Sequence, residues 1–350
     1  MFVPYCTRER LSRAADVTSP AWLSEEIDQA IEAGSRAVDK LVRRGDDTRP
    51  AFAPWTGTIE YDWPAIGNSG SYRFWLGPHS LISVSAATSG GTDVTASAIG
   101  YPAQYGPPYD ALDLDQADSS VYATGDGVGQ RSLSITGVWS AVPITEDTRS
   151  SWVLDGSIAS GATEADIVAP VSVGNLIRIG SERMIVTDRD WTATADTATL
   201  SASMAAQSLT VASGAAYIRG DTLSIEGERL IVRDIVSNTL VVQRAADGST
   251  LAAHSSAAVF VLRTCTLARA QLGTTAAGHT DGDLVYVHRY PPIVEQLAVA
   301  YALDQRAQEN SGYARTIGAG DGTRNASGAG ISTLEDRVLE AYGRVLSGAV

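Results

Sequence analysis

One segment of this chain occurs twice. Residues 174–187 read GNLIRIGSERMIVT, and residues 220–233, 46 positions later, read GDTLSIEGERLIVR. The two copies align without a gap and share a Glu-Arg pair at 182–183 and 228–229. In each copy, apolar and polar residues alternate on both sides of a turn-like Gly-Ser or Glu-Gly step. A period of two across such a step predicts a β-hairpin, so the repeat predicts a duplicated β unit.

A second repeat follows at a different spacing. Its members are an arginine, a glycine, a threonine and a histidine, found as Arg244, Gly248, Thr250 and His254 and again, 25 residues later, as Arg269, Gly273, Thr275 and His279. A tandem duplication, which remains the alternative, would give one spacing throughout. The unequal spacings favour nesting. We therefore expect a β insert over 155–290 made of two nested repeats: a first unit, about 165–190 plus 265–288, interrupted by a complete copy at about 203–263.

The segment between the two units, 191–205, has the weakest strand pattern of the insert and is expected to be a linker. Both histidines of the repeat, His254 and His279, lie beside a predicted strand. They could form paired ligands, but no cysteine, histidine or aspartate spacing accompanies them. We expect hydrogen-bonded turn residues.

The N-terminal 50 residues carry helical periodicity. Residues 5–18 are predicted to form a short helix capped by Thr7, and residues 24–44 a longer one capped by Ser24. The second helix has an apolar stripe at helical spacing and a basic side that includes Arg36 and Arg43. A solvated face is the expectation for that basic side, and a partner contact is the alternative.

Two further helices are predicted at the C-terminal end. One begins at Pro291-Pro292, and the other follows the capping box Ser332/Glu335 and runs to about residue 346. The apolar stripes of the N-terminal helices and of the C-terminal helices each need a partner surface to be buried. The helices of 1–50 and 290–350 are therefore expected to pack together as one unit.

The section from 51 to 150 is β-rich, with short predicted strands at 73–76, 81–85 and 131–136. Residues 46–70 are rich in proline, glycine and tryptophan and are expected to be irregular. Trp55 and Trp63 in this stretch are expected to be packing anchors or interface residues. The predicted fold class is α+β, with a helical unit built from both chain ends and a β-rich middle.

The sequence offers no set of catalytic residues. It lacks a Gly-x-Ser-x-Gly elbow, a His-Glu-x-x-His motif and a cysteine with a suitable histidine partner. The four aspartates Asp110, Asp113, Asp115 and Asp118 lack the glycine and glutamate of a calcium loop, so a solvated acidic loop is expected. We predict no enzyme, no cofactor and no metal. The net charge of −14 also argues against tight binding of nucleic acid, and no apolar run is long enough to span a membrane.

Several segments resemble the head-tail connector proteins of long-tailed bacteriophages, also called adaptor or head-completion proteins. They are YCTRERL at 5–11, IDQAIEAGSRAVD at 27–39, RFWL at 73–76 and ITGVW at 135–139, with the two C-terminal helices completing the pattern. The resemblance covers roughly 1–140 and 290–350. The insert at 155–290 departs from the compact members of that family.

The resemblance implies a structural function. Twelve copies would form a ring beneath the portal protein, extend the DNA channel, and offer a docking surface to a tail-side neck protein such as a stopper or tail terminator. The protein would then belong to the head-tail junction of the virion, assembled in the host cytoplasm, with DNA passing through without specific binding. Carried over to this chain, the portal or ring interface would comprise Arg36, Arg43, Arg315, Arg324, Leu334, Val338, Tyr342 and Val345.

A second class of function remains open. A carbohydrate-binding or depolymerising tail or decoration protein would explain tryptophan-rich loops beside a repeated β domain, because flat rings stack on sugars. That alternative predicts that Trp55 or Trp63 contacts a glycan. It leaves the helical ends unexplained.

Overall fold

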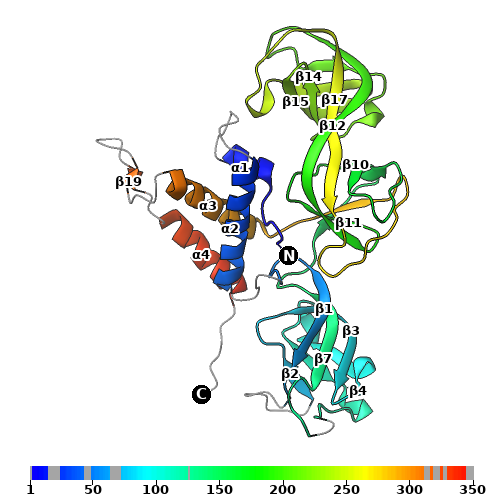
Figure 1. Cartoon of the computed structure of the whole chain (residues 1–350), viewed down its shortest axis with the longest axis vertical. Coiled ribbons are helices and arrows are strands. Elements are labelled where there is room, and N and C mark those ends of the chain that lie inside the picture. Colours follow the sequence, from blue (N-terminus) through cyan, green and yellow to red (C-terminus); the bar gives the residue numbers. More distant parts are fainter. Residues whose placement is uncertain are drawn as a thin grey trace.

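The protein combines helices and strands, which confirms the predicted α+β class. The computed structural model describes residues 2–14, 24–42, 49–63, 72–124, 127–310, 316–317, 324–325 and 329–343. A group of helices stands beside a tall column of β structure (Figure 1). No helix among the described residues has the length and apolar character needed to cross a membrane.

The helices come from both ends of the chain. Their bounds are Arg8–Ala14 (α1), Ser24–Val42 (α2), Pro292–Asn310 (α3) and Ala329–Tyr342 (α4). A single apolar core joins them, formed by residues such as Leu11, Ile31, Val294, Leu297 and Val338. Close contact between α2 and α3 depends on Gly34, because a Cβ there would lie 2.6 Å from Ala298 O.

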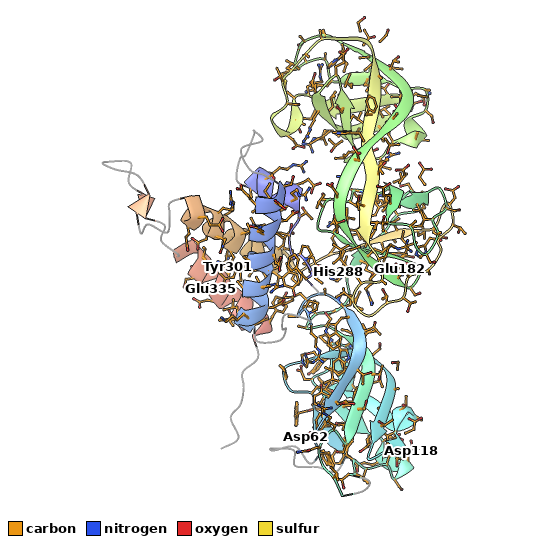
Figure 2. The ribbon with its side chains drawn as sticks, in the orientation of Figure 1. Asp62, Asp118, Glu182, His288, Tyr301 and Glu335 are labelled. Atoms are coloured by element: carbon orange, nitrogen blue, oxygen red, sulfur yellow. The ribbon has the colours of Figure 1, made fainter. Side chains whose placement is uncertain are left out.

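Helix ends agree in part with the sequence. Thr7 caps α1, since its Oγ1 accepts a hydrogen bond from Arg10 N at 3.2 Å. The predicted capping box at Ser332 is wrong, because α4 begins three residues earlier, at Ala329. Glu335 instead accepts a hydrogen bond from Tyr301 Oη at 2.6 Å, which links α4 to α3 (Figure 2). The C-terminal end predicted near residue 346 lies outside the described residues.

The foot of the β column in Figure 1 contains two small sheets, which we call the β1–β7 unit. One sheet has the order β1-β7-β3-β4 and the other β2-β6-β5. The strands are Trp55–Tyr61 (β1), Arg73–Trp75 (β2), Leu81–Ser89 (β3), Thr92–Asp93 (β4), Ala98–Tyr101 (β5), Ala111–Leu114 (β6) and Leu133–Trp139 (β7). The prediction of irregular structure over 46–70 is therefore wrong for β1, which pairs with β7 along all seven residues.

The rest of the column is one eleven-stranded sheet. Its path is β13-β16-β15-β14-β17-β12-β11-β18-β8, with β10 joined to β17 and β9 joined to β10. The strands are Glu146–Asp147 (β8), Val153–Asp155 (β9), Glu164–Val168 (β10), Leu176–Ile179 (β11), Glu182–Leu200 (β12), Ser208–Thr210 (β13), Thr222–Ile225 (β14), Glu228–Val236 (β15), Thr239–Gln243 (β16), His254–Ala268 (β17) and Val285–His288 (β18). A further two-stranded ladder pairs Thr316–Ile317 (β19) with Arg324–Asn325 (β20).

The eleven-stranded sheet has two apolar cores. The first contains Leu154, Ile179, Val186 and Val287, and we call its surroundings the proximal unit. The second contains Leu200, Leu223, Val232 and Val259 and defines the distal unit. The long strands β12 and β17 run through both units, side by side (Figure 1). The expected linker at 191–205 is therefore wrong up to Leu200, because β12 is continuous.

Each half of the first sequence repeat is a β-hairpin, as predicted. The β11–β12 hairpin turns between Ile179 and Glu182, and the β14–β15 hairpin turns between Ile225 and Glu228. The proximal unit also contacts the β1–β7 unit, since Thr56 N donates a hydrogen bond to Leu272 O at 2.8 Å. The column is thus tied together by backbone contacts as well as by the shared strands.

Candidate functional site

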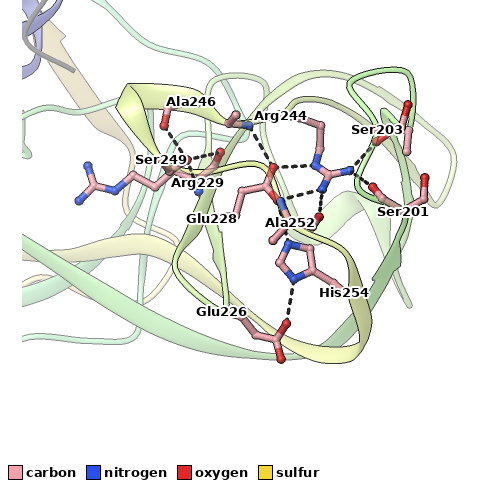
Figure 3. A network of polar contacts seen from close by, with 12 residues as sticks. Ser201, Ser203, Glu226, Glu228, Arg229, Arg244, Ala246, Ser249, Ala252 and His254 are labelled. Carbon is pink, nitrogen blue, oxygen red and sulfur yellow. Dashed lines mark hydrogen bonds and ion pairs between the residues drawn. The ribbon is translucent and has the colours of Figure 1, made fainter. Parts of the chain in front are cut away.

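One group of buried polar side chains lies in the distal unit, and we call it the distal cluster: Glu228, Arg244 and His254. Arg244 donates to both carboxylate oxygens of Glu228, from Nε and Nη2, each at 2.8 Å. His254 Nε2 lies 2.8 Å from Glu228 Oε2. The amides of Ala245 and Ala252 donate to the same carboxylate, at 3.0 and 3.1 Å. Figure 3 shows these contacts meeting on the Glu228 side chain.

The proximal unit contains the same arrangement, the proximal cluster: Glu182, Arg269 and His279. Arg269 donates to the two carboxylate oxygens of Glu182, each at 2.7 Å, and His279 Nε2 lies 2.9 Å away. The amides of Ala270 and Ala277 complete the set at 2.9 and 3.0 Å. Each contact of the distal cluster therefore has a counterpart, 46 residues away for the glutamate and 25 residues away for its partners.

The two clusters hold the turns of their units together. Arg244 and Arg269 each donate from Nη2 to a backbone oxygen, of Ala252 and Ala277 respectively, at 2.6 Å. Burial would raise the pKa of Glu182 and Glu228, but hydrogen bonds from arginine, histidine and backbone amides outweigh it and lower each pKa to about 2. A carboxylate with all its acceptor positions committed is poorly suited to proton transfer. His254 and His279 are hydrogen-bonded, as predicted, but the prediction of turn residues is wrong, because His254 begins β17 and His279 forms a β-bridge with Ile158.

The residues predicted for a portal or ring interface are dispersed. Arg43, Arg315 and Val345 lie outside the described residues, and so does the side chain of Arg324 on β20. Arg36 is exposed on α2 and forms an ion pair with Glu32 at 2.7 Å.

The three predicted interface residues on α4 point largely inward. Val338 is completely buried in the helical core, so it holds α4 to the other helices and does not present a surface to a partner. Leu334 and Tyr342 are partly buried against the same core, with the Tyr342 ring 5.3 Å from that of Phe52. The large apolar side chain that α4 exposes is Leu339, at 39%.

Trp55 and Trp63, the predicted sugar-contacting residues, are buried. The Trp55 ring stacks on Trp139 at 5.6 Å, and the Trp63 ring packs against Tyr122 at 5.2 Å. Both belong to the core of the β1–β7 unit. They are packing anchors, which was one of the two expectations for these residues. Buried rings cannot stack on a glycan, so neither is a glycan contact.

A different set of aromatic residues is exposed, on the outer face of the β2-β6-β5 sheet. Trp75 is 46% exposed, and its ring meets that of Tyr101 edge-on at 5.9 Å. The guanidinium carbon of Arg73 lies 3.5 Å from the centre of the Tyr101 ring. In the sequence, Arg73-Phe-Trp-Leu76 is a predicted strand and one of the segments with the family resemblance, and neither feature indicates an exposed ring. The strict alternation that buries Phe74 was the available signal that Trp75 faces outward.

The four aspartates of the acidic segment have separate structural partners. Asp110 accepts a hydrogen bond from Ser80 Oγ, Asp113 binds Arg73, Asp115 accepts from the amide of Ala117, and Asp118 accepts from Ser97 Oγ. Figure 2 places Asp118 at the foot of the column. Across the described residues, no three histidine, cysteine or acidic side chains come together as a metal site would require.

Two of the cavities on the surface of the described chain lie beside the eleven-stranded sheet. The larger, about 730 Å³, lies between the proximal and distal units and is lined by Trp152, Tyr217 and Arg149 among others. The smaller, about 240 Å³, lies where α1 meets the β column and includes His288. Burial lowers the pKa of His288 to about 4, so its ring is neutral near pH 7. Glu182, Glu228, Arg244 and Arg269 line neither cavity.

The chain was compared with known proteins in three ways. Protein-family models, curated proteins and solved structures were all compared with the chain, and none of them matched it.

Proposed function

We propose that this protein is a structural adaptor of a bacteriophage neck, forming a ring between the portal and the tail-side proteins. The observation that carries the proposal is the meeting of both chain ends in one helical group beside the β column (Figure 1). The helices at 1–50 and 290–350 would then form the connector module that joins neighbouring rings. The sequence resemblance supports the location in a phage neck. The shared core of the four helices supports a single module that could join neighbouring rings.

The chemistry of the buried charges supports a structural function. In both Glu–Arg–His clusters the carboxylate accepts hydrogen bonds at each oxygen, which suits groups that hold turns in place. The net charge also fits a DNA conduit, because each copy carries −14 and a ring of twelve would be strongly acidic. Such a ring repels phosphates and lets DNA pass without sticking.

We infer further that the two β units arose by nesting of one copy within another. Glu228 meets its arginine 16 residues later, whereas Glu182 meets the equivalent arginine 87 residues later. A tandem duplication would place the partner of Glu182 at the shorter spacing, where the sequence has Ala198. The interrupted first unit explains both spacings. The distal unit is then an insertion that continues from the proximal unit through β12 and β17 and contacts α1 through the Arg13–Asp247 ion pair.

The exposed surface of the helical group is the proposed site of contact with the portal. Arg36 on α2 and Leu339 on α4 are both exposed. Leu339 takes the place of the buried Val338 as the apolar anchor of this contact. Central apolar and arginine side chains typically dominate such interfaces.

Electron microscopy of the protein mixed with the portal of the same phage tests the proposal. Negative-stain images are expected to show a ring of this protein stacked on the portal ring. The variant Leu339→Asp is expected to lose stacking, whereas the matched control Val236→Asp, on β15 of the distal unit, is expected to keep it. A protein that stays monomeric and does not bind the portal at any tested concentration contradicts the adaptor function.

A further inference from the structure

The outer face of the β2-β6-β5 sheet is a rigid platform of aromatic rings around one neutral ion pair. Register places Trp75, Ala111 and Tyr101 in one row across the three strands, and Arg73, Asp113 and Ile99 in the next. The opposite face of the sheet buries Phe74, Leu112 and Leu114 in the core. Trp75 in the first row and Ile99 in the second are therefore presented to solvent, 46% and 42% exposed, by a well-anchored sheet.

The polar groups of the platform are already ordered. Arg73 donates from Nε and Nη2 to the two oxygens of Asp113, each at 2.7 Å. The guanidinium also stacks on the Tyr101 ring, a cation–π contact that restricts it further. Two rigid side chains held this way lose little entropy when a ligand binds.

We propose that this platform, defined by Arg73, Trp75, Tyr101 and Asp113, binds a neutral glycan. The C–H groups of a sugar carry partial positive charge and pack against the negative face of an aromatic ring. An arginine has five N–H donors, of which the bond to Asp113 uses two, so donors remain for sugar hydroxyls. The carboxylate of Asp113 supplies the acceptor.

Charge selects a neutral ligand over an anionic one. The positive charge of Arg73 is compensated by Asp113, so the platform itself is neutral. Asp110 directly precedes β6, and Asp115 and Asp118 follow it, so these carboxylates would repel uronic acids and nucleic acid phosphates. The same argument excludes single-stranded nucleic acid, which needs basic residues beside the stacking rings.

Size favours a glycan over a protein partner. Strands spaced about 4.8 Å apart make a three-stranded face roughly 10 Å wide, and four residues at about 3.3 Å each make it roughly 13 Å long. A stable protein interface covers about 800 Å² on each partner. The platform is several times smaller, and neither of the two cavities described above includes its residues. A sheet face of this size fits one or two sugar rings of an extended chain.

Affinity electrophoresis of the full-length protein tests the proposal. Native gels would contain dextran, soluble starch or galactomannan as neutral probes, and alginate as the anionic probe. At least one neutral polysaccharide is expected to retard the protein, independently of salt. Trp75→Ala is expected to weaken that association about tenfold or more, because the exposed ring supplies most of the stacking area.

Control variants separate binding from folding. Phe260→Ala removes a similarly exposed ring, 37%, from the distal unit and is expected to leave retardation unchanged. If Trp75→Ala lowers the thermal unfolding midpoint, Trp75→Tyr is expected to restore folding and part of the binding. Asp113→Asn should weaken retardation by the neutral polysaccharide, since it breaks the neutral pair and leaves Arg73 uncompensated.

Three results would overturn the proposal. They are the absence of retardation by all three neutral polysaccharides, equal retardation of Trp75→Ala and the unchanged protein, and salt-sensitive retardation by alginate alone. Self-association that disappears in Trp75→Ala, measured by sedimentation velocity, would assign the face to a second copy instead. None of these measurements involves the portal, so the glycan site and the adaptor function can fail separately.

Discussion

The proximal and distal β units have the same buried cluster but different surroundings. In both, a glutamate accepts hydrogen bonds from one arginine, one histidine and two alanine amides. The backbone agrees as well, since Ala245 and Ala270 are both left-handed, with φ of 49° and 53°. The glutamate and the arginine are 16 residues apart in one unit and 87 in the other, yet their contacts are the same. The contacts of the cluster therefore characterise the unit, and the length of chain between its members does not.

The units differ where they meet other parts of the molecule. His254 Nδ1 faces a second carboxylate, Glu226, at 2.9 Å. The position equivalent to Glu226 is Gly180, and His279 Nδ1 lies 3.9 Å from Asp283, beyond hydrogen-bonding distance. Likewise, Leu272 of the proximal unit is buried in the core of the β1–β7 unit, whereas its equivalent Asp247 forms an ion pair with Arg13 of α1. The proximal copy therefore docks on the β1–β7 unit through an apolar contact, whereas the distal copy meets α1 through an ion pair.

Removing the glutamate charge is expected to have the largest effect on stability. Glu228→Gln leaves Arg244, which has no exposed side-chain surface, without a compensating charge. Breaking one partner of a buried pair typically costs about 3–5 kcal/mol in the free energy of unfolding. Urea denaturation followed by circular dichroism would measure this loss. Glu182→Gln is expected to cost a similar amount, because its contacts are the same.

The control for these variants is Glu226→Gln, whose side chain is 61% exposed. Exposed ion pairs contribute about 0–1 kcal/mol, so a small change is expected. A loss below about 1 kcal/mol in Glu228→Gln would contradict the structural importance of the clusters. A large difference between Glu182→Gln and Glu228→Gln would break the equivalence of the two units.

Acid is expected to weaken both units together. The pKa values of Glu182 and Glu228 are about 2 in the folded protein, below the ordinary value of 4.5. Groups with a lowered pKa stabilise the fold fully above about pH 4.5, and that stabilisation is lost as the pH falls from about 4.5 towards 2. One pKa unit corresponds to about 1.4 kcal/mol, so each site contributes about 3 kcal/mol.

Unfolding midpoints measured at several pH values between about 7 and 2 would check this expectation. The double variant Glu182→Gln/Glu228→Gln is the matched control, because it should lose most of the acid dependence in that range. An unchanged acid dependence in the double variant would show that other carboxylates are responsible.

A smaller difference is expected between two equivalent glycines. Gly273 and Gly248 have φ of 77° and 76°, so alanine at either position is strained by about 1–2 kcal/mol. At Gly273 the added Cβ would also overlap Thr56 O, where the proximal unit docks on β1. Gly273→Ala is therefore expected to cost about 1–3 kcal/mol beyond the backbone strain that it shares with Gly248→Ala, measured in the same denaturation assay. Equal costs would indicate that the Thr56 contact is readily rearranged.

Local elements could be read from the sequence because their signals are local. The hairpins at β11–β12 and β14–β15 have their alternation and turn residues within fourteen positions. Strand β1 was missed because its pairing partner, β7, lies far along the chain and its flanks are rich in proline and glycine. The end of β12, around Ala193 and Leu200, was missed because threonine and alanine show little apolar alternation, and pairing with β17 stabilises it.

The candidate binding face shows the same limit. An aromatic stretch was visible in the sequence, but the sequence alone did not separate Trp55 and Trp63 from Trp75. Exposure depends on which side of a sheet is covered, and that is decided by packing of the whole β1–β7 unit.

The sequence by itself determined the repeat, the two hairpins and the cap of α1, because these depend on periodicity and on hydrogen bonds between near neighbours. Only the tertiary structure decided that Glu182 meets Arg269 across 87 residues, and that Trp75 remains exposed. Contacts of that separation form only when the intervening chain has folded and offset the entropy of closing a long loop. The segment at 174–187 thus forms a hairpin because of its own residue pattern. Its Glu182 joins the proximal cluster only because the fold brings Arg269 and His279 to it.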